Sequence, residues 1–162
     1  MKLHDVYLLL GSNIQPEKNI RAALGRLRNQ VSIKAISPVW ETPAVGSVGP
    51  DFLNLVVYIS TQFSQEDLKY QVLRKLETRL GRVRSADKNA PRPIDLDILI
   101  YDNHSLEPNI WLQAHIVCPL SGLLPDLVDP NTGSRMSKLA LNFQMNTSAL
   151  QRPDLHFDEF LL

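Results

Sequence analysis

The chain has 162 residues, of which 44% are hydrophobic and 21% charged, and this composition indicates one globular domain over residues 1–162. Seventeen Lys and Arg residues balance seventeen Asp and Glu residues, so the net charge gives no reason to expect nucleic acid or a membrane as a partner. A single cysteine, Cys118, excludes an internal disulfide and, with no recognisable targeting segment, favours a cytoplasmic location.

The first third of the chain predicts a strand, a helix and two further strands. Residues 6–10 are a compact apolar run that ends at Gly-Ser-Asn, which indicates a buried strand. Residues 16–29 begin with Pro and carry apolar residues at helical spacing. Alternation then predicts a strand over 31–42, bulged or at a sheet edge near Pro38. After a loop rich in Pro and Gly, β-branched residues predict a strand over 52–59.

The rest of the chain predicts a second helix and a fourth strand. The helix covers residues 64–80, with a serine at its start and Gly81 placed to end it. The polar segment 82–93 leads to a strand over 94–100, and residues 137–142 form a short helix in a C-terminal extension. The order β-α-β-β-α-β is typical of an α+β, ferredoxin-like domain, with an antiparallel sheet, both helices on one face and the other face free.

The fourth strand contains two aspartates separated by one residue. Because side chains alternate along a strand, Asp95 and Asp97 share one face, together with Leu99 and Tyr101. The opposite face carries Ile94, Leu96, Ile98 and Ile100. Carboxylates held this close repel each other unless they are protonated or bridged by a cation, and oxygen ligands suit magnesium. The pair alone is equally consistent with an edge strand whose charges face water.

Basic residues stand close to this pair in the sequence. They are Arg82, Arg84, Lys88 and Arg92. A polyphosphate bound through a divalent cation needs carboxylates for the metal and guanidinium groups for the remaining oxygens, so the combination favours phosphate chemistry. Neither a P-loop nor a dinucleotide fingerprint is present. Residues 10–13, Leu-Gly-Ser-Asn, allow close approach of a chain or ligand, or simply turn a strand into a helix.

Residues 88–99, K-N-A-P-R-P-I-D-L-D-I-L, closely resemble the signature of the 6-hydroxymethyl-7,8-dihydropterin pyrophosphokinases of folate biosynthesis. L-G-S-N at 10–13, T-P-A-V-G at 42–46 and P-D-F-L-N at 50–54 are similar to further motifs of that family. The resemblance extends from residue 6 to about residue 130 and implies a ferredoxin-like core.

The resemblance implies transfer of a pyrophosphoryl group from ATP to the hydroxymethyl oxygen of a reduced pterin, with release of AMP. It implies that Asp95 and Asp97 hold two Mg²⁺ ions and that Arg82 and Arg92 act on the phosphates, while residues 82–93 close over them. The implied ATP-binding residues are Glu77, Arg84, Arg92, Ile98 and His115. The implied pterin-binding residues are Thr42, Pro43, Val45, Gly46, Phe52, Asn54 and Asp95.

Some of these residues have ordinary structural interpretations. Phe52 and Val45 could belong to the core, Asn54 could satisfy backbone groups at a strand end, and a lone His115 is often structural.

The chain departs from the family pattern in three places and is identified as a shortened member. Asn89-Ala90 replaces an aromatic-Gly pair, and Phe52 replaces a tyrosine but keeps a stacking face. The segment after His115 lacks several residues that normally supply a phosphate-binding arginine and a second pterin-stacking aromatic. We therefore expect weaker substrate binding, unless replacement contacts exist. The candidates for those contacts are His115, Trp111, His156 and Phe157.

Three alternatives can be compared with the sequence. A palm-type nucleotidyl transferase would need a third acidic ligand, for which Glu41 and Asp51 are the nearby candidates. An RNA-recognition domain would need a basic-Gly-aromatic pattern in its third strand. The strand predicted over 52–59 in this chain lacks that pattern. The third alternative is a catalytically weak or divergent paralogue that binds a different small molecule or acts as a regulatory module.

Overall fold

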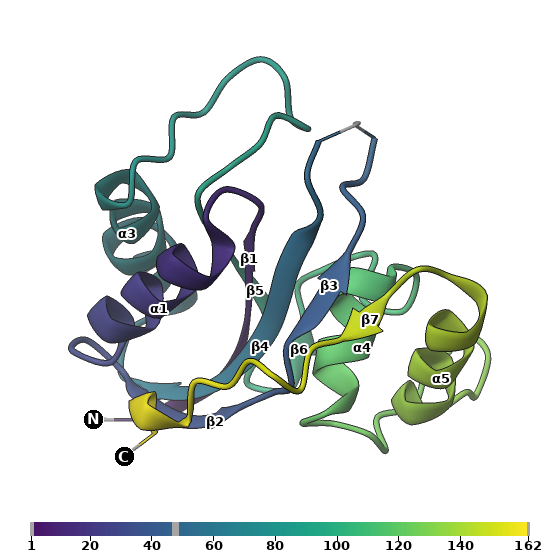
Figure 1. The fold of residues 1–162 in the computed structure, drawn as a ribbon. Coiled ribbons are helices and arrows are strands. Elements are labelled where there is room, and N and C mark those ends of the chain that lie inside the picture. Colours follow the sequence, from purple (N-terminus) through teal and green to yellow (C-terminus); the bar gives the residue numbers. More distant parts are fainter. Residues whose placement is uncertain (1, 47–48, 162) are drawn as a thin grey trace.

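The computed structural model describes residues 2–46 and 49–161; Ser47 and Val48, in the predicted Pro- and Gly-rich loop, lie outside the described residues. The described chain is an α+β structure built on a seven-stranded sheet in the order β6-β5-β1-β4-β3-β7, with β2 also paired to β4 (Figure 1). Every pair of neighbouring strands in this sheet is antiparallel.

The elements follow the predicted order, with additions near the C-terminus. The strands are β1 (His4–Ser12), β2 (Ser32–Ile36), β3 (Trp40–Thr42), β4 (Phe52–Thr61), β5 (Asp95–Tyr101), β6 (His104–Ser105) and β7 (Leu150–Gln151). The helices are α1 (Pro16–Leu27), α2 (Gln65–Asp67), η1 (Leu68–Leu73), α3 (Arg74–Arg79), α4 (Ala114–Ser121), α5 (Met136–Asn146) and η2 (Asp158–Phe160). No helix of the described residues is long and apolar enough to cross a membrane.

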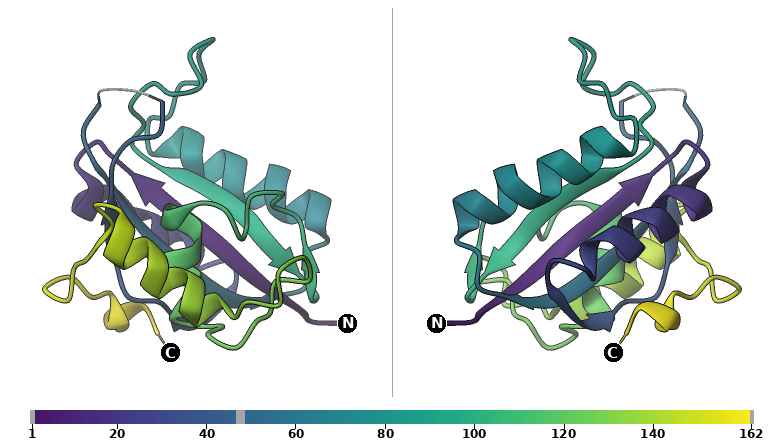
Figure 2. Two further views of the ribbon diagram at one scale, coloured as in Figure 1. Left: turned by 90° about the vertical axis from the view of Figure 1, so that its right-hand side faces the viewer. Right: turned by 90° about the vertical axis from the view of Figure 1, so that its left-hand side faces the viewer.

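Helices α1 and α3 cover one face of the sheet, as predicted (Figure 2). The buried cluster between these helices and the sheet is called the α1-side core. It includes Leu8, Leu10, Ile20, Leu24, Leu55, Val57, Leu68, Leu76, Ile94 and Leu96. Burial of these apolar side chains is the main force that holds the two layers together.

The second predicted helix is present but is not a regular α-helix. The Ser64 hydroxyl accepts a bond from the Asp67 N–H at 3.1 Å, and Gly81 follows the helix with φ +93°. Both ends therefore match the sequence signals. Between them, η1 is a π-helix of six residues, a widened turn that the apolar pattern did not predict.

The strand predicted over 31–42 is divided into β2 and β3 at Ser37 and Pro38. Pro38 has no N–H that could bond the neighbouring strand. The preceding residue, Ser37, makes the contact with β4 instead by donating its N–H to the Val56 carbonyl at 2.8 Å. The Ser37 hydroxyl accepts the Val56 N–H, also at 2.8 Å.

Strand β5 contains a bulge that changes which residues share a face. Ile98 pairs with Leu8 and Ile100 with Tyr7, so Leu99 is an extra residue. As a result Ile100 lies on the same face as Leu99, and Tyr101 packs against the α1-side core. The prediction that Tyr101 shares the face of Asp95 and Asp97 is therefore wrong, as is the prediction for Ile100.

The second face of the sheet is not left free, which corrects the prediction. Helices α4 and α5 pack on half of it (Figure 2). This α4-side core includes Leu9, Val56, Leu99, Ile100, Ile116, Val117, Leu120 and Met136. No helical signal for α4 is present in the sequence, because its run of apolar residues lacks a regular polar face and contains Pro119. The other half of this face remains open and carries the site described below.

The C-terminal segment ties β3 to the α1 layer. Strand β7 pairs with β3, and the chain then places Phe157 and Phe160 in the α1-side core. Glu41 binds Arg152 at 2.7 Å and pairs in the sheet with Leu53, a residue of the α1-side core. Glu41 therefore lies on the face opposite to Asp95 and cannot be the third acidic ligand that a palm-type enzyme would need.

Candidate active site

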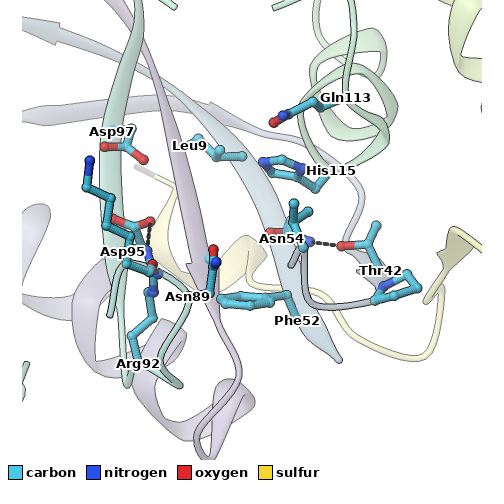
Figure 3. Close-up of a pocket in the computed structure, with 14 residues that line it drawn as sticks. Leu9, Thr42, Phe52, Asn54, Asn89, Arg92, Asp95, Asp97, Gln113 and His115 are labelled. Atoms are coloured by element: carbon cyan, nitrogen blue, oxygen red, sulfur yellow. Dashed lines mark hydrogen bonds and ion pairs between the residues drawn. The ribbon is translucent and has the colours of Figure 1, made fainter. Parts of the chain in front are cut away.

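The open half of the second face places polar residues from three neighbouring strands side by side. Gly11 of β1 pairs with Asn54 of β4 on one side and with Asp95 of β5 on the other. Leu9, two residues earlier, pairs with Asp97. Because residues two apart share a face, these side chains lie together above the sheet (Figure 3).

A cavity of about 220 Å³ lies over these strands, and the start of α4 and two loops complete its walls. Its lining residues are Leu9, Gly11, Thr42, Pro43, Val45, Phe52, Asn54, Lys88, Asn89, Arg92, Asp95, Asp97, Gln113 and His115. One end carries the aspartates and the other carries Phe52, Thr42 and Asn54 (Figure 3). The cavity is thus acidic at one end and suited to a flat heterocycle at the other.

The polar residues at the heterocycle end are held in place before any ligand binds. The Asn54 side-chain amide donates to the Thr42 hydroxyl at 2.8 Å, and both residues are buried. A Cβ atom built on Gly11 would lie 3.0 Å from the Asn54 Oδ1 atom. The missing side chain of Gly11 therefore makes room for the Asn54 amide, which fixes the donor and acceptor positions in the cavity.

Replacing Gly11 with Ala should displace Asn54 and weaken binding at this end of the cavity. We expect the KM for a heterocyclic substrate to rise about five- to thirtyfold, since losing one well-placed hydrogen bond costs about 1 to 2 kcal/mol. Steady-state kinetics with that substrate varied would measure the effect. Gly25→Ala is the matched control, because its Cβ would meet only Phe160 at an ordinary 3.5 Å. Equal KM values for the two variants would contradict this role of Gly11.

Asn13 shows what the Leu-Gly-Ser-Asn stretch does. Its Oδ1 atom accepts the Arg92 N–H at 2.8 Å, and its Nδ2 atom donates to the Pro50 carbonyl at 3.3 Å. The Asn13 N–H also donates to the Arg92 carbonyl at 3.2 Å. Asn13 is buried, so it fixes the end of the 82–93 segment and the loop before β4 to the sheet.

Asp95 lies between two guanidinium groups. Arg82 donates to its Oδ1 atom at 2.5 Å, and Arg92 donates to its Oδ2 atom at 3.0 Å. Arg92 also donates to the Lys88 carbonyl. Both arginines assigned to phosphate thus neutralise Asp95 in this structure.

Glu77 supports this cluster from within the protein. Its Oε2 atom accepts bonds from Arg82 at 2.7 Å and the Leu96 N–H at 2.9 Å. Its Oε1 atom accepts bonds from Arg74 at 3.0 Å and Arg84 at 2.8 Å. Burial raises the pKa of Glu77 to about 7, although the Leu96 N–H and Arg82 act against the rise. Only 2% of the Glu77 side chain is exposed, and Glu77 is not a lining residue of the cavity. Glu77 therefore positions the arginines, and the prediction that it contacts ATP directly does not fit this burial.

Asp97 differs from Asp95, because no group among residues 2–46 and 49–161 donates a hydrogen bond to its carboxylate. Burial and the charge of Asp95 raise the pKa of Asp97 to about 6, while Arg74 and Arg82 act against the rise. A partly buried carboxylate without a donor is a group prepared to accept a cation.

Three hollows meet at Asp97. Beside the 220 Å³ cavity lies a hollow of about 350 Å³ that contains most of the nearby cations. Its charged lining residues are Arg74, Arg82, Arg84, Asp87, Lys88, Arg92, Asp95 and Asp97. A third hollow, of about 550 Å³, is lined by Lys69, Tyr70, Leu73, Arg74, Asp97, Ile98, Leu106 and Glu107, with three further residues. Asp97 belongs to all three.

The structure brings together most of the residues predicted for the pterin. Thr42, Pro43, Val45, Phe52, Asn54 and Asp95 line one cavity. Val45 is 61% exposed, so it is not a core residue. Gly46 is not among the lining residues; a Cβ on it would lie 2.9 Å from the Asn89 side chain, so Gly46 allows two loops to touch. Figure 1 shows these loops at the same end of the sheet.

The residues predicted for the nucleotide are divided between hollows. Ile98 lines the 550 Å³ hollow, whereas His115 lines the 220 Å³ cavity together with Phe52. Burial lowers the pKa of His115, which favours a neutral imidazole there. Of the suggested replacement contacts, His115 alone lines this cavity, since Phe157 lies in the α1-side core and Trp111 packs against the α4-side core. His156 is exposed and is not a lining residue of the cavity.

Several site residues were not predicted from the sequence. Leu9, Asn89 and Gln113 line the cavity, and Arg74 lines two of the hollows. Alternation along β1 is the one signal that would have found Leu9, because it lies two residues before Gly11. Asn89 stands within the signature at 88–99, whereas nothing local in the sequence indicates Gln113 or Arg74.

Paired carboxylates beside several guanidinium groups on an antiparallel α+β sheet define a class of site that binds phosphorylated small molecules. The chain belongs to the 7,8-dihydro-6-hydroxymethylpterin-pyrophosphokinase (HPPK) family, whose model matches residues 7–125.

Two curated relatives illustrate the range of proteins that the chain resembles. The 2-amino-4-hydroxy-6-hydroxymethyldihydropteridine pyrophosphokinase of Pseudomonas aeruginosa is 33% identical over 141 residues, or 80% of this chain and 86% of that protein. The folic acid synthesis protein FOL1 of Dictyostelium discoideum is 29% identical over 147 residues, which cover 85% of this chain and 22% of that protein.

The fold is also similar to that of a solved structure, HPPK-DHPS of Plasmodium falciparum. The TM-score is 0.67 at 13% identity, and the match covers 88% of this chain and 46% of that one. The chain therefore spans about half of the length of that protein, and this likeness bears on the fold.

Proposed function

We propose that the three hollows meeting at Asp97 divide the two substrates of a pyrophosphokinase between them. As a member of this family, the chain transfers a pyrophosphoryl group from ATP to 6-hydroxymethyl-7,8-dihydropterin in folate biosynthesis. The observation that carries the proposal is the position of Asp97, which borders a heterocycle-sized cavity, a cationic hollow and a third hollow to which Tyr70 and Ile98 contribute apolar surface. Family membership does not favour the alternative of a divergent regulatory paralogue.

In this arrangement the reduced pterin occupies the 220 Å³ cavity. Phe52 stacks on the ring, while Asn54 and Thr42 bind its polar edge. Pro43 and Val45 complete the wall, and Gly46 keeps the two neighbouring loops in contact. The hydroxymethyl group then points toward Asp95 and Asp97, at the opposite end of the cavity (Figure 3).

The polyphosphate of ATP occupies the 350 Å³ hollow. Arg82, Arg84, Lys88 and Arg92 line it. Arg92 exchanges Asp95 for a phosphate oxygen when ATP binds, and residues 82–93 close over the phosphates to exclude water. The nucleoside then extends into the 550 Å³ hollow, where Ile98 and Tyr70 offer apolar contacts.

The donor set at Asp95 and Asp97 fits Mg²⁺. Among the residues that the structure describes, no group of three His, Cys, Asp or Glu side chains is placed to hold a metal. Mg²⁺ commonly binds one or two carboxylates and completes its shell with water and phosphate oxygens, which matches a pair of aspartates beside an ATP site. Two such ions, when bound, would neutralise phosphate charge. The protein side chains orient both substrates and keep the carboxylates in place.

Three broader proposals accompany this one. The strand pairing around β5, β1, β4 and β3 supports a ferredoxin-like core. The packing of Phe157 and Phe160 against α1 supports one domain over residues 1–162. A single unpaired cysteine, the buried Cys118, supports a reducing, cytoplasmic location.

Replacing Arg92 with Ala should lower the rate of pyrophosphoryl transfer more than the affinity for the pterin. The guanidinium group is expected to act on charge that develops on the phosphates, so we expect kcat to fall by about a hundredfold or more. The pterin KM should change by less than about threefold. Arg79→Ala, an exposed arginine outside these hollows, is the control. A kcat equal to that of the parent would rule out this assignment of Arg92.

A further inference from the structure

Arg74, the first residue of α3, is a partly buried cation that no sequence motif marks. Its side chain is 29% exposed, and one Nη atom donates to Glu77 at 3.0 Å. Within the part of the chain that the structure describes, its remaining N–H groups have no acceptor. Because Glu77 is buried and binds three arginines, it fixes the Arg74 guanidinium and leaves most of its donors available.

The position of Arg74 relates two of the hollows. Arg74 and Asp97 are the residues that line both the cationic 350 Å³ hollow and the 550 Å³ hollow. The first hollow suits a polyphosphate because of its cations, and the second suits a nucleoside because of apolar residues such as Tyr70 and Ile98. In a nucleotide, the α-phosphate is the group that links the polyphosphate to the ribose. A nucleotide bound across both hollows would therefore place its α-phosphate where the hollows join.

We propose that Arg74 binds the α-phosphate of ATP and stabilises AMP as the leaving group, an inference that rests on the proposed function. In the transfer, the hydroxymethyl oxygen forms a bond to the β-phosphorus while the bond from that phosphorus to the α–β bridging oxygen breaks. The electron pair stays on the bridging oxygen, which becomes a terminal oxygen of AMP, and the hydroxyl proton passes to water. The α-phosphate therefore gains one negative charge, next to the Arg74 guanidinium.

Between His115 and Arg135 the sequence contains no Lys or Arg, so the segment that follows His115 offers no cation to the phosphates. Arg74 lies on α3 and needs no loop to order it, because its ion pair with Glu77 already exists. Lys75 and Arg79, on the same helix, line neither hollow and so cannot replace it.

The test compares Arg74→Ala and Arg74→Lys with the parent enzyme and with Arg79→Ala. Titration calorimetry measures the affinity for AMP, and steady-state kinetics measures kcat and the pterin KM. We expect Arg74→Ala to lose about ten- to a hundredfold in AMP affinity, to lose at least as much in kcat, and to keep its pterin KM. Arg74→Lys should recover part of both losses, and Arg79→Ala should match the parent.

Two results would overturn the inference. Unchanged AMP affinity in Arg74→Ala would remove the contact with the α-phosphate. A rise in pterin KM as large as the loss of AMP affinity would show that Arg74 only positions Glu77 and the sheet below it. Failure of the proposed function is a different result, because the parent protein itself would then form no pterin diphosphate from ATP.

Discussion

Asp97→Asn is expected to abolish pyrophosphoryl transfer and at the same time make the metal-free protein more stable. The rate should fall by about a thousandfold or more, because the substitution removes a carboxylate that we propose binds Mg²⁺. Stability should rise because burial and Asp95 raise the pKa of the Asp97 carboxyl from its usual 3.8 to about 6. Ionisation of Asp97 in the folded protein therefore lowers the free energy of unfolding.

The pH dependence of this gain follows from the direction of the shift. Below pH 3.8 the raised pKa of Asp97 does not lower the free energy of unfolding of the parent. This free energy falls as the pH rises from 3.8 toward 6, and the loss is complete above pH 6. The advantage of Asp97→Asn should thus be absent at pH 3.5 and on the order of 2 kcal/mol at pH 7.5, measured by urea unfolding with a chelator present.

Asp95→Asn is the matched control for this prediction. Asp95 is paired with Arg82 and Arg92, so its removal should abolish activity but lower stability at neutral pH. If both variants were destabilised to the same extent, Asp97 would not be the unpaired carboxylate described here.

Arg82→Met is expected to destabilise the protein by about 3 kcal/mol and to remove most of the activity. Only 10% of the Arg82 side chain is exposed, and one of its Nη atoms bonds both Glu77 and Asp95. Loss of the guanidinium leaves two partly buried carboxylates with fewer partners, and breaking such a cluster is costly.

Arg84→Met provides a close comparison, because Arg84 binds the same glutamate but is 53% exposed. An exposed ion pair contributes less than about 1 kcal/mol. Urea unfolding of both variants would separate the two arginines. Similar losses of stability in the two variants would show that the buried Arg82 stabilises the protein no more than the exposed Arg84 does.

Local signals in the sequence predicted the frame of the site well. The alternation at the start of β5 placed Asp95 and Asp97 on one face, and the helix signals at Ser64 and Gly81 matched the observed ends. These features depend on residues a few positions apart. The pairing of the carboxylates needed no knowledge of the rest of the chain.

Features that depend on distant partners were not predicted. The bulge at Leu99 arises from pairing with β1, and the sequence of β5 alone cannot show it. Helix α4 has His115 and Ser121 as its polar residues and no regular polar face, and its cover over the second face depends on packing with α5. The burial of Glu77 under three arginines likewise requires segments that meet only in the folded chain.

The most direct test of the account is product analysis with the purified protein, ATP, Mg²⁺ and 6-hydroxymethyl-7,8-dihydropterin, followed by phosphorus NMR and mass spectrometry. We expect AMP and the pterin diphosphate in equal amounts, with no product when Asp97→Asn replaces the parent. Formation of ADP and a pterin monophosphate, or of no pterin product by the folded parent, would contradict it.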